Sequence, residues 1–246
     1  MTQVRERDSG ELPPVLILAA GKGTRLGELG RHCAKVLVPI DGRPLLDLQL
    51  EYLAREGVRR VVINAHHLSN QITAHVRKYH GPLKITVVVE RHLLGTAGAA
   101  INALPSLGRE TFFVLYGDVL IFEPLAPVLQ THAEAGAAAT LCVYPHEDPR
   151  DKGIVEIDGR GQVVSFAEKD PDQAGPGLVN AGLYVIEPSL LVGFQRETFL
   201  DFGHDVFPAC LRAGQHLQVY RLPREVLDIG TLKDLARGSH GGFTDR

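Results

Sequence analysis

The chain has 246 residues, of which 44% are hydrophobic and 22% charged, a composition typical of a globular protein with one large domain or two small ones. Its formal net charge of −3 excludes a general electrostatic attraction to nucleic acid or to an anionic membrane. Any recognition of phosphate therefore depends on a few residues placed at one site.

The cysteines and the start of the chain bear on the cellular compartment. Cys33, Cys142 and Cys210 are odd in number and far apart, which favours neither a disulfide framework nor a zinc site. No apolar run reaches the length of a membrane span, and Met1–Glu11 is too polar for a signal peptide. We expect a cytoplasmic protein with reduced thiols and with neither a membrane nor a nucleic-acid partner.

The first half of the chain alternates predicted strands and helices. Strands are predicted at residues 15–18, 58–64, 83–89 and 112–115, and helices at 44–53, at 68–79 and after residue 95. This alternation is typical of a doubly wound parallel sheet with right-handed crossovers. Ligands of such sheets lie beyond the carboxyl ends of the strands.

The second half has a different pattern. A helix is predicted at 125–135, a strand at 138–144, a β-hairpin at 153–166, a strand at 179–186, a helix at 202–213, an extended segment at 217–221 and a helix at 231–236. We expect one domain over residues 15–237, with flexible tails at 1–14 and 238–246. No internal repeat is present in the sequence.

A segment of small residues and cations follows the first strand. It consists of Ala19, Ala20, Gly21, Lys22, Gly23, Thr24 and Arg25. Small residues let backbone N–H groups approach an anion closely, and cations neutralise it, so the segment predicts a polyphosphate site. Leu26 stands where a dinucleotide fingerprint has its third glycine, and the P-loop pattern is absent from this segment. A structural turn with solvated cations is the alternative.

Other strand ends carry residues that suit the same chemistry. Gly95 and Thr96 open a second small-residue segment, and Gly117 and Asp118 follow the strand at 112–115. A carboxylate at the end of a strand can coordinate Mg²⁺. Asp228 also follows an extended segment and suits the same role. Either aspartate could instead cap a turn or a helix. Two carboxylates beside a polyphosphate loop would suit Mg²⁺-assisted phosphoryl or nucleotidyl transfer.

Three polar residues near the hairpin point to a second substrate. Glu168 and Lys169 close the hairpin, and Asn180 lies in an otherwise apolar strand. Lys169 is either a solvated charge or the ligand of a phosphate monoester, and a buried Asn180 would need partners such as sugar hydroxyls.

Six motifs in order resemble those of the sugar-1-phosphate nucleotidylyltransferases. They are Leu18-Ala19-Ala20-Gly21-Lys22-Gly23-Thr24-Arg25-Leu26 with Lys35-Val36-Leu37-Val38-Pro39, Leu94-Gly95-Thr96-Ala97-Gly98, Tyr116-Gly117-Asp118, Phe166-Ala167-Glu168-Lys169, Val179-Asn180-Ala181-Gly182 and Asp228-Ile229-Gly230-Thr231. The length and the last motif are most similar to the mannose-1-phosphate or heptose-1-phosphate guanylyltransferase branch.

The resemblance implies a fold and a reaction. The fold is a Rossmann-like, glycosyltransferase-A type α/β/α sandwich with a mixed, mainly parallel central sheet. The reaction needs Mg²⁺: a sugar or sugar-like cyclitol 1-phosphate attacks the α-phosphorus of a nucleoside triphosphate, giving an NDP-sugar and pyrophosphate. GTP is the first choice of nucleotide, with thymidylyl, uridylyl or cytidylyl transfer as alternatives.

The resemblance also implies residue roles. Arg25, Lys35 and Asp118 would be catalytic, and Asp118 and Asp228 would hold Mg²⁺. The nucleotide would contact Ala19, Ala20, Gly21, Lys22, Gly23, Thr24, Gly95, Thr96 and Gly117. The sugar phosphate would contact Glu168, Lys169, Asn180 and Gly153.

One position departs from the family pattern. The family usually has proline before the motif lysine, whereas this chain has Ala34 before Lys35. Because proline restricts the backbone, alanine predicts a less preorganised loop. Two other classes of function stay open: a non-catalytic regulator that binds nucleotide-sugars, and a dinucleotide oxidoreductase. The oligomeric state stays open too, with a homodimer as one alternative.

Overall fold

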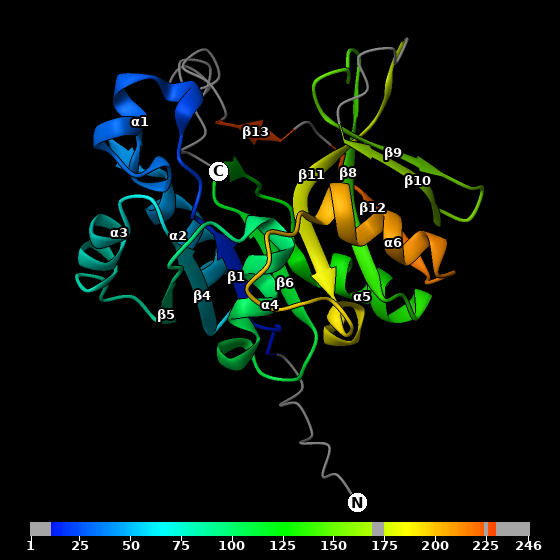
Figure 1. Ribbon diagram of the computed structural model, residues 1–246, viewed down its shortest axis with the longest axis horizontal. Coiled ribbons are helices and arrows are strands. Elements are labelled where there is room, and N and C mark those ends of the chain that lie inside the picture. The colour runs from blue at the N-terminus through cyan, green and yellow to red at the C-terminus, as the bar shows by residue number, and fades with distance from the viewer. Residues whose placement is uncertain (1–10, 169–174, 224–225, 230–246) are drawn as a thin grey trace, which may run out of the picture.

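The computed structural model describes residues 11–168, 175–223 and 226–229 (Figure 1). Within these ranges, strands form a mixed sheet with helices on both faces, which confirms the predicted α/β fold. The predicted helix at 231–236, Lys169, the tail at 238–246 and residues 1–10 of the other tail lie outside the described residues. No helix in the described ranges is long and apolar enough to span a bilayer.

The first half of the chain forms a parallel part of the sheet in the order β5-β4-β1-β6. Its strands are β1 (Val15–Leu18), β4 (Arg60–Ala65), β5 (Lys84–Val89) and β6 (Phe112–Tyr116). The helices between them are α1 (Glu28–His32), α2 (Leu45–Arg55), α3 (Ser69–Val76) and α4 (Gly95–Leu107). The predicted strand–helix alternation is therefore confirmed.

The second half extends the sheet mainly through antiparallel pairs. Its strands are β8 (Ala139–His146), β9 (Gly153–Ile157), β10 (Val163–Glu168), β11 (Gly177–Ile186) and β12 (Leu217–Arg221). The pairs β10–β9, β9–β11, β11–β8 and β11–β6 are antiparallel, whereas β12 runs parallel to β8. The helices of this half are α5 (Leu125–Ala135) and α6 (Phe207–Arg212). Short pairs join β2 (Pro39–Ile40) with β3 (Arg43–Pro44) and β7 (Val119–Leu120) with β13 (Leu227–Asp228). The predicted hairpin is present as β9 and β10.

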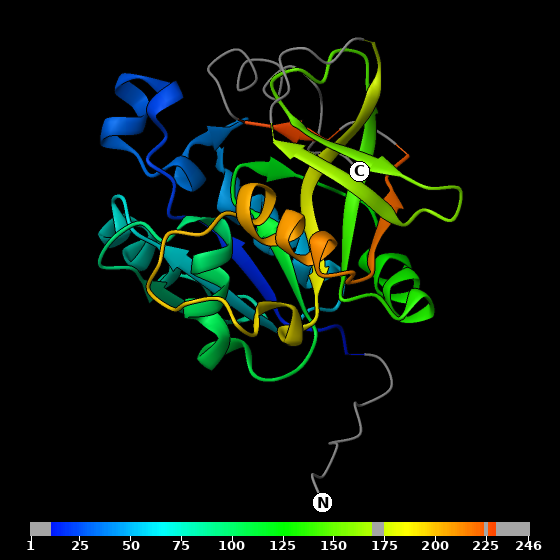
Figure 2. The same ribbon diagram turned by 45° about the vertical axis from the view of Figure 1, so that its right-hand side comes forward.

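Alternating side chains of the central strands build two cores. In β1, Val15 and Ile17 contribute to the core that contains residues of α2, α3 and α5, and Leu16 contributes to the core that contains residues of α4 and α6. Figures 1 and 2 show α4 and α6 on one side of the sheet and α2 on the other. Because successive side chains of a strand point to opposite faces of the sheet, each face has an apolar surface on which helices pack.

The predicted helix at 202–213 is only partly correct. Phe202–Val206 forms a π-helical turn, and the α-helix α6 begins at Phe207. The Asp201 side chain starts the turn by accepting from the backbone N–H groups of Gly203 and His204, at 2.8 and 3.1 Å. Asp201 is therefore the N-cap of the π-helical turn, and the α-helix begins at Phe207 rather than at Phe202.

Strand β11 changes its partners along its length. It pairs with β6 through Leu183–Ile186 and with β9 through Val179. Between these two segments the register of β11 against β8 shifts, and Gly182 adopts a φ of +72°. A Cβ at Gly182 would lie 2.9 Å from the Tyr116 ring, so only glycine lets that ring pack here.

Candidate active site

A cavity of about 360 Å³ lies at the carboxyl ends of β1 and β6. Its lining includes three predicted segments that are far apart in sequence: Ala19, Ala20, Gly21, Lys22, Gly23, Thr24 and Arg25; Gly95 and Thr96; and Gly117 and Asp118, together with Lys35. The structure therefore brings together the whole predicted nucleotide set and the three predicted catalytic residues.

The glycine-rich loop is fixed at both ends. At its start the Ala19 N–H donates to Asn64 Oδ1 at 2.7 Å. At its end Gly23 has a φ of +63°, and a Cβ at Gly30 would lie 2.2 Å from the Gly23 carbonyl oxygen. Helix α1 therefore packs directly on the loop because residue 30 is glycine, a contact that the sequence analysis missed.

Two further glycines of the cavity wall are required by close backbone contacts. A Cβ at Gly117 would lie 2.4 Å from the Leu18 carbonyl oxygen, and a Cβ at Gly95 would lie 2.4 Å from that of Leu200. Gly95 also has a φ of +73°. These contacts explain why small residues recur at the strand ends, and they let backbone line the cavity.

Lys35 forms an ion pair with Asp118 inside the cavity. The two side chains are 11% and 25% exposed, so water screens the pair only in part. Ala34, just before Lys35, donates its N–H to Gln71 Oε1 at 3.0 Å, and Gln71 Nε2 donates to the His32 carbonyl at 2.8 Å. A side chain of α3 therefore holds the loop that carries Lys35.

Asp228 lies beside Asp118 because β13 pairs with β7. The Ile229 N–H donates to the Asp118 carbonyl at 2.7 Å. Burial and the charge of Asp118 raise the pKa of the Asp228 carboxyl, whereas Lys152, Lys35 and Arg25 lower it. Asp228 Oδ1 is buried and accepts no hydrogen bond from the described residues. Two adjacent carboxylates with such an oxygen fit a divalent cation.

Lys152 is a cation of the site that the sequence analysis missed. Its Nζ lies 4.0 Å from Asp228 Oδ2, and its side chain is 23% exposed. The only signal in the sequence is its place next to Gly153 in a charged stretch. Lys152, Lys35 and Arg25 therefore supply positive charge around the two aspartates.

The residues predicted to contact the sugar phosphate form a separate group. Gly153, Glu168 and Asn180 lie on the adjacent strands β9, β10 and β11, with Gly153 paired to Glu168. Cβ atoms at Gly153 and Gly203 would lie 2.8 and 2.7 Å from Glu168 Oε2, so the carboxylate occupies a slot between two glycines. These three predicted residues are outside the cavity lining among the described residues.

Buried tyrosines connect this group to the cavity. Asn180 Nδ2 donates to the Tyr184 hydroxyl at 2.6 Å, and that hydroxyl donates to Tyr116 at 3.1 Å. Tyr116 lines the cavity. Burial raises the pKa of both tyrosines well above the ordinary value, so they act as neutral hydrogen-bonding groups. Asn180 is therefore oriented by internal partners.

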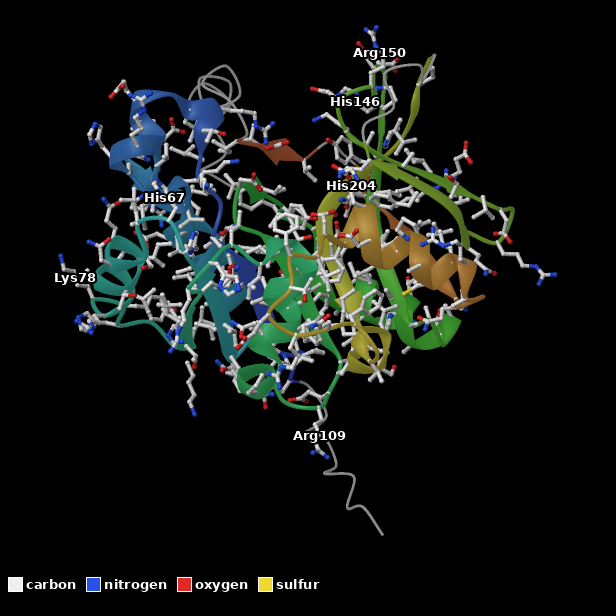
Figure 3. The ribbon with its side chains drawn as sticks, in the orientation of Figure 1. His67, Lys78, Arg109, His146, Arg150 and His204 are labelled. Atoms are coloured by element: carbon white, nitrogen blue, oxygen red, sulfur yellow. The ribbon has the colours of Figure 1, made fainter. Side chains whose placement is uncertain are left out.

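The predicted residue Thr96 lines the cavity together with two residues that the sequence analysis missed. The Thr96 hydroxyl donates to Asp201 Oδ2 at 2.8 Å and accepts from the Phe202 N–H at 2.8 Å. Asp201 and Phe199 both line the cavity. Figure 3 shows His204, a residue of this turn, on the same side of the molecule as His146 and Arg150, whereas Arg109 lies at the opposite end.

Comparison with known proteins identifies the family. A family model described as nucleotidyl transferase matches residues 14–241. The chain is 34% identical over 229 residues to the mannose-1-phosphate guanylyltransferase catalytic subunit beta of Danio rerio, covering 91% of this chain and 62% of that protein. It is 29% identical over 241 residues to a UTP–glucose-1-phosphate uridylyltransferase of Synechocystis, covering 92% and 62%. The chain thus spans less than two thirds of these relatives.

Solved structures share the fold. The structure of HddC from Yersinia pseudotuberculosis complexed with GMP-PN has a TM-score of 0.81 at 24% identity, covering 93% of this chain and 99% of that one. A putative glucose-1-phosphate thymidylyltransferase from Bacillus anthracis has a TM-score of 0.80 at 18% identity, covering 93% and 94%. Since the family model spans nearly the whole sequence, the chain belongs to the nucleotidyl transferase family, as its motifs predicted.

Proposed function

We propose that the chain is a sugar-1-phosphate nucleotidylyltransferase with GTP as its preferred nucleotide. A phosphate oxygen of the sugar or cyclitol 1-phosphate attacks the α-phosphorus of the triphosphate. The bond from the α-phosphorus to the bridging oxygen breaks, and pyrophosphate leaves with the electron pair of that bond. The observation that carries the proposal is the partly buried Lys35–Asp118 ion pair, which lies beside the glycine-rich loop and next to Asp228.

The proposed chemistry needs little proton transfer. The attacking phosphate is already an anion, so catalysis depends on alignment and on neutralising the charge of two phosphates that repel each other. Lys35, Arg25 and Lys152 surround the two aspartates and supply this charge. Removing one such contact is expected to lower the rate about a hundredfold, roughly 3 kcal/mol of transition-state stabilisation.

Asp118 and Asp228 are the proposed Mg²⁺ ligands. Asp228 Oδ1 has no hydrogen-bond partner among residues 11–168, 175–223 and 226–229, and this and the mutual repulsion of the two carboxylates support the assignment. Bound Mg²⁺ would neutralise phosphate oxygens and polarise the α-phosphorus. Without a bound cation, the mutual repulsion of the two carboxylates would be offset by Lys35, Lys152 and Arg25.

The choice of base rests on the relatives. Mannose-1-phosphate guanylyltransferases of Danio rerio and Mycobacterium tuberculosis are 34% and 33% identical to the chain, and these similarities favour GTP. The Synechocystis uridylyltransferase, at 29% identity, makes uridylyl transfer the second candidate. Both candidates use the same loop and the same two aspartates.

A panel of four nucleoside triphosphates against several sugar and cyclitol 1-phosphates tests the proposal. The full chain is mixed with Mg²⁺ and each pair, and pyrophosphate release is measured. We expect GTP with one sugar phosphate to give the highest kcat/KM. Binding of nucleotide without turnover anywhere on the panel would contradict the enzyme and favour a regulatory binder. Faster turnover with UTP would replace guanylyl with uridylyl transfer.

A further inference from the structure

Asn64 and Glu90 form a buried polar pair that the proposed chemistry does not use. Asn64 is 2% and Glu90 4% exposed, and both lie at the carboxyl end of the sheet, in β4 and just after β5. A carboxylate is rarely buried to this extent unless its oxygens have partners. The partners of this one are therefore informative.

A continuous chain of hydrogen bonds passes through the pair. The Ala19 N–H donates to Asn64 Oδ1 at 2.7 Å, and Asn64 Nδ2 donates to Glu90 Oε1 at 2.7 Å. At the other end the Leu94 N–H donates to Glu90 Oε2 at 3.2 Å. Ala19 begins the glycine-rich loop, and Leu94 directly precedes Gly95 and helix α4. The chain thus links the two nucleotide-binding segments.

The order of donors and acceptors explains why a carboxylate stands at position 90. Both ends of the chain are backbone donors, Ala19 and Leu94. Asn64 offers one acceptor and one donor, and Glu90 offers two acceptors, so every contact is matched. With glutamine at position 90, one donor would face another donor however the two side-chain amides turn. One buried N–H group would always be unpaired, which is costly.

The surroundings hold Glu90 in place from several sides. Its N–H donates to the Ala65 carbonyl at 2.8 Å, and its own carbonyl lies 3.1 Å from His66 Nδ1. Its carboxylate lies at the N-terminal end of α4, where the helix dipole stabilises a negative charge. The Leu94 carbonyl accepts from the Leu200 N–H at 2.9 Å, so the far end of the chain is anchored too.

We propose that Asn64 and Glu90 are positioning residues that hold the glycine-rich loop and the Gly95–Thr96 segment at the separation required to bind a nucleoside triphosphate. Glu90 acts through the Asn64 side chain and the Leu94 backbone amide, since these donors already occupy both of its oxygens. The inference rests on the proposed function, because it assumes that the triphosphate bridges these two segments.

A rescue experiment tests this proposal. Glu90→Gln leaves one donor unmatched, whereas the double variant Asn64→Asp/Glu90→Gln restores every contact, with the carboxylate moved to position 64. Glu110→Gln is the matched control, because Glu110 pairs with Arg60 elsewhere in the fold and its side chain is 40% exposed. Figure 3 shows Arg109, the residue before it, at the end of the molecule away from His204.

The readouts are the dissociation constants of Mg-GTP and Mg-UTP, the KM values of both substrates, and hydrogen exchange of the Ala19 and Leu94 amides. We expect Glu90→Gln to weaken binding of both nucleotides about tenfold, or about 1.4 kcal/mol, and to speed exchange at one of the two amides. The KM of the sugar phosphate should change less than twofold. The double variant should recover nucleotide binding to within about threefold, and Glu110→Gln should bind like the wild type.

A double variant no better than Glu90→Gln would overturn the proposal. Weaker binding of GTP with unchanged binding of UTP would also overturn the proposal, because that result would mean that Glu90 determines which base is bound. Failure of the proposed function is a separate result, namely a wild-type chain that binds and converts none of the triphosphates. Amide exchange in the variants would still decide whether the hydrogen-bond chain exists.

Discussion

Replacing Ala34 by proline tests how the chain holds Lys35 without the proline that its family usually has. Ala34 has φ −58° and ψ 133°, and Cys33 before it has φ −127° and ψ 128°. The first φ is close to the value that a proline ring imposes, and the second pair is compatible with a residue before proline. The backbone therefore accepts proline without strain.

The free-energy change has two parts of opposite sign. Proline removes the Ala34 N–H that donates to Gln71 Oε1, a partly buried hydrogen bond worth about 1 kcal/mol. It also restricts the unfolded chain, which stabilises the fold by roughly 0.4–1 kcal/mol. We expect Ala34→Pro to change the free energy of unfolding by less than about 1 kcal/mol and kcat/KM by less than about threefold.

Gln71→Ala is the informative partner of this variant. In the wild type it removes two hydrogen bonds, from Ala34 and to the His32 carbonyl, and should cost about 2 kcal/mol. In the Ala34→Pro background only the second bond remains, so the cost should fall to about 1 kcal/mol. The difference between the two costs is a coupling free energy of about 1 kcal/mol. It measures the stabilisation that the Gln71 side chain provides through its hydrogen bond to the Ala34 N–H, which proline lacks.

Urea unfolding of the four proteins measures the coupling, and pyrophosphate release measures the effect on Lys35. We expect Gln71→Ala to lower kcat more than Ala34→Pro does, because it frees the loop that carries the lysine. A loss of more than about 3 kcal/mol in Ala34→Pro would refute the backbone argument. Equal costs of Gln71→Ala in both backgrounds would refute the role of its side chain.

Two further predictions concern single residues. Asp118→Asn should lower Mg²⁺-dependent turnover at least a hundredfold while the circular dichroism spectrum stays unchanged, and wild-type turnover would rule out the metal role. Gly95→Ala should destabilise the fold by about 2 kcal/mol or more, seen as a lower Tm, because its Cβ would lie 2.4 Å from the Leu200 carbonyl at a φ of +73°. Gly21→Ala is its control, since a Cβ there has no atom within 4 Å.

Much of the fold could be predicted from local patterns in the sequence. Apolar runs such as Val15–Leu18 predicted buried strands, and the spacing within Leu45–Arg55 predicted a helix. Such patterns depend on residues that are close together in the sequence, so they can be recognised without knowledge of the tertiary structure. The same holds for small residues after a strand, which led to the glycine-rich loop.

The missed residues share a different property. Asn64 and Glu90 are 26 positions apart, and Gln71 lies 37 positions from Ala34. Their roles come from hydrogen bonds between segments whose adjacency depends on the order β5-β4-β1-β6. Lys152 likewise becomes part of the site only because β13 brings Asp228 beside Asp118.

The sequence alone determined the class of fold, the family and the segments that meet at the cavity. Apolar periodicity predicts the strands and helices, and short motifs identify the family and the segments of the site. Only the tertiary structure decided how those segments are held: by the Asn64–Glu90 chain between two loops, by the Gln71 bond that supports the loop of Lys35, and by the pairing that brings Asp228 beside Asp118. Hydrogen bonds and burial between distant residues depend on three-dimensional packing, which no local pattern specifies.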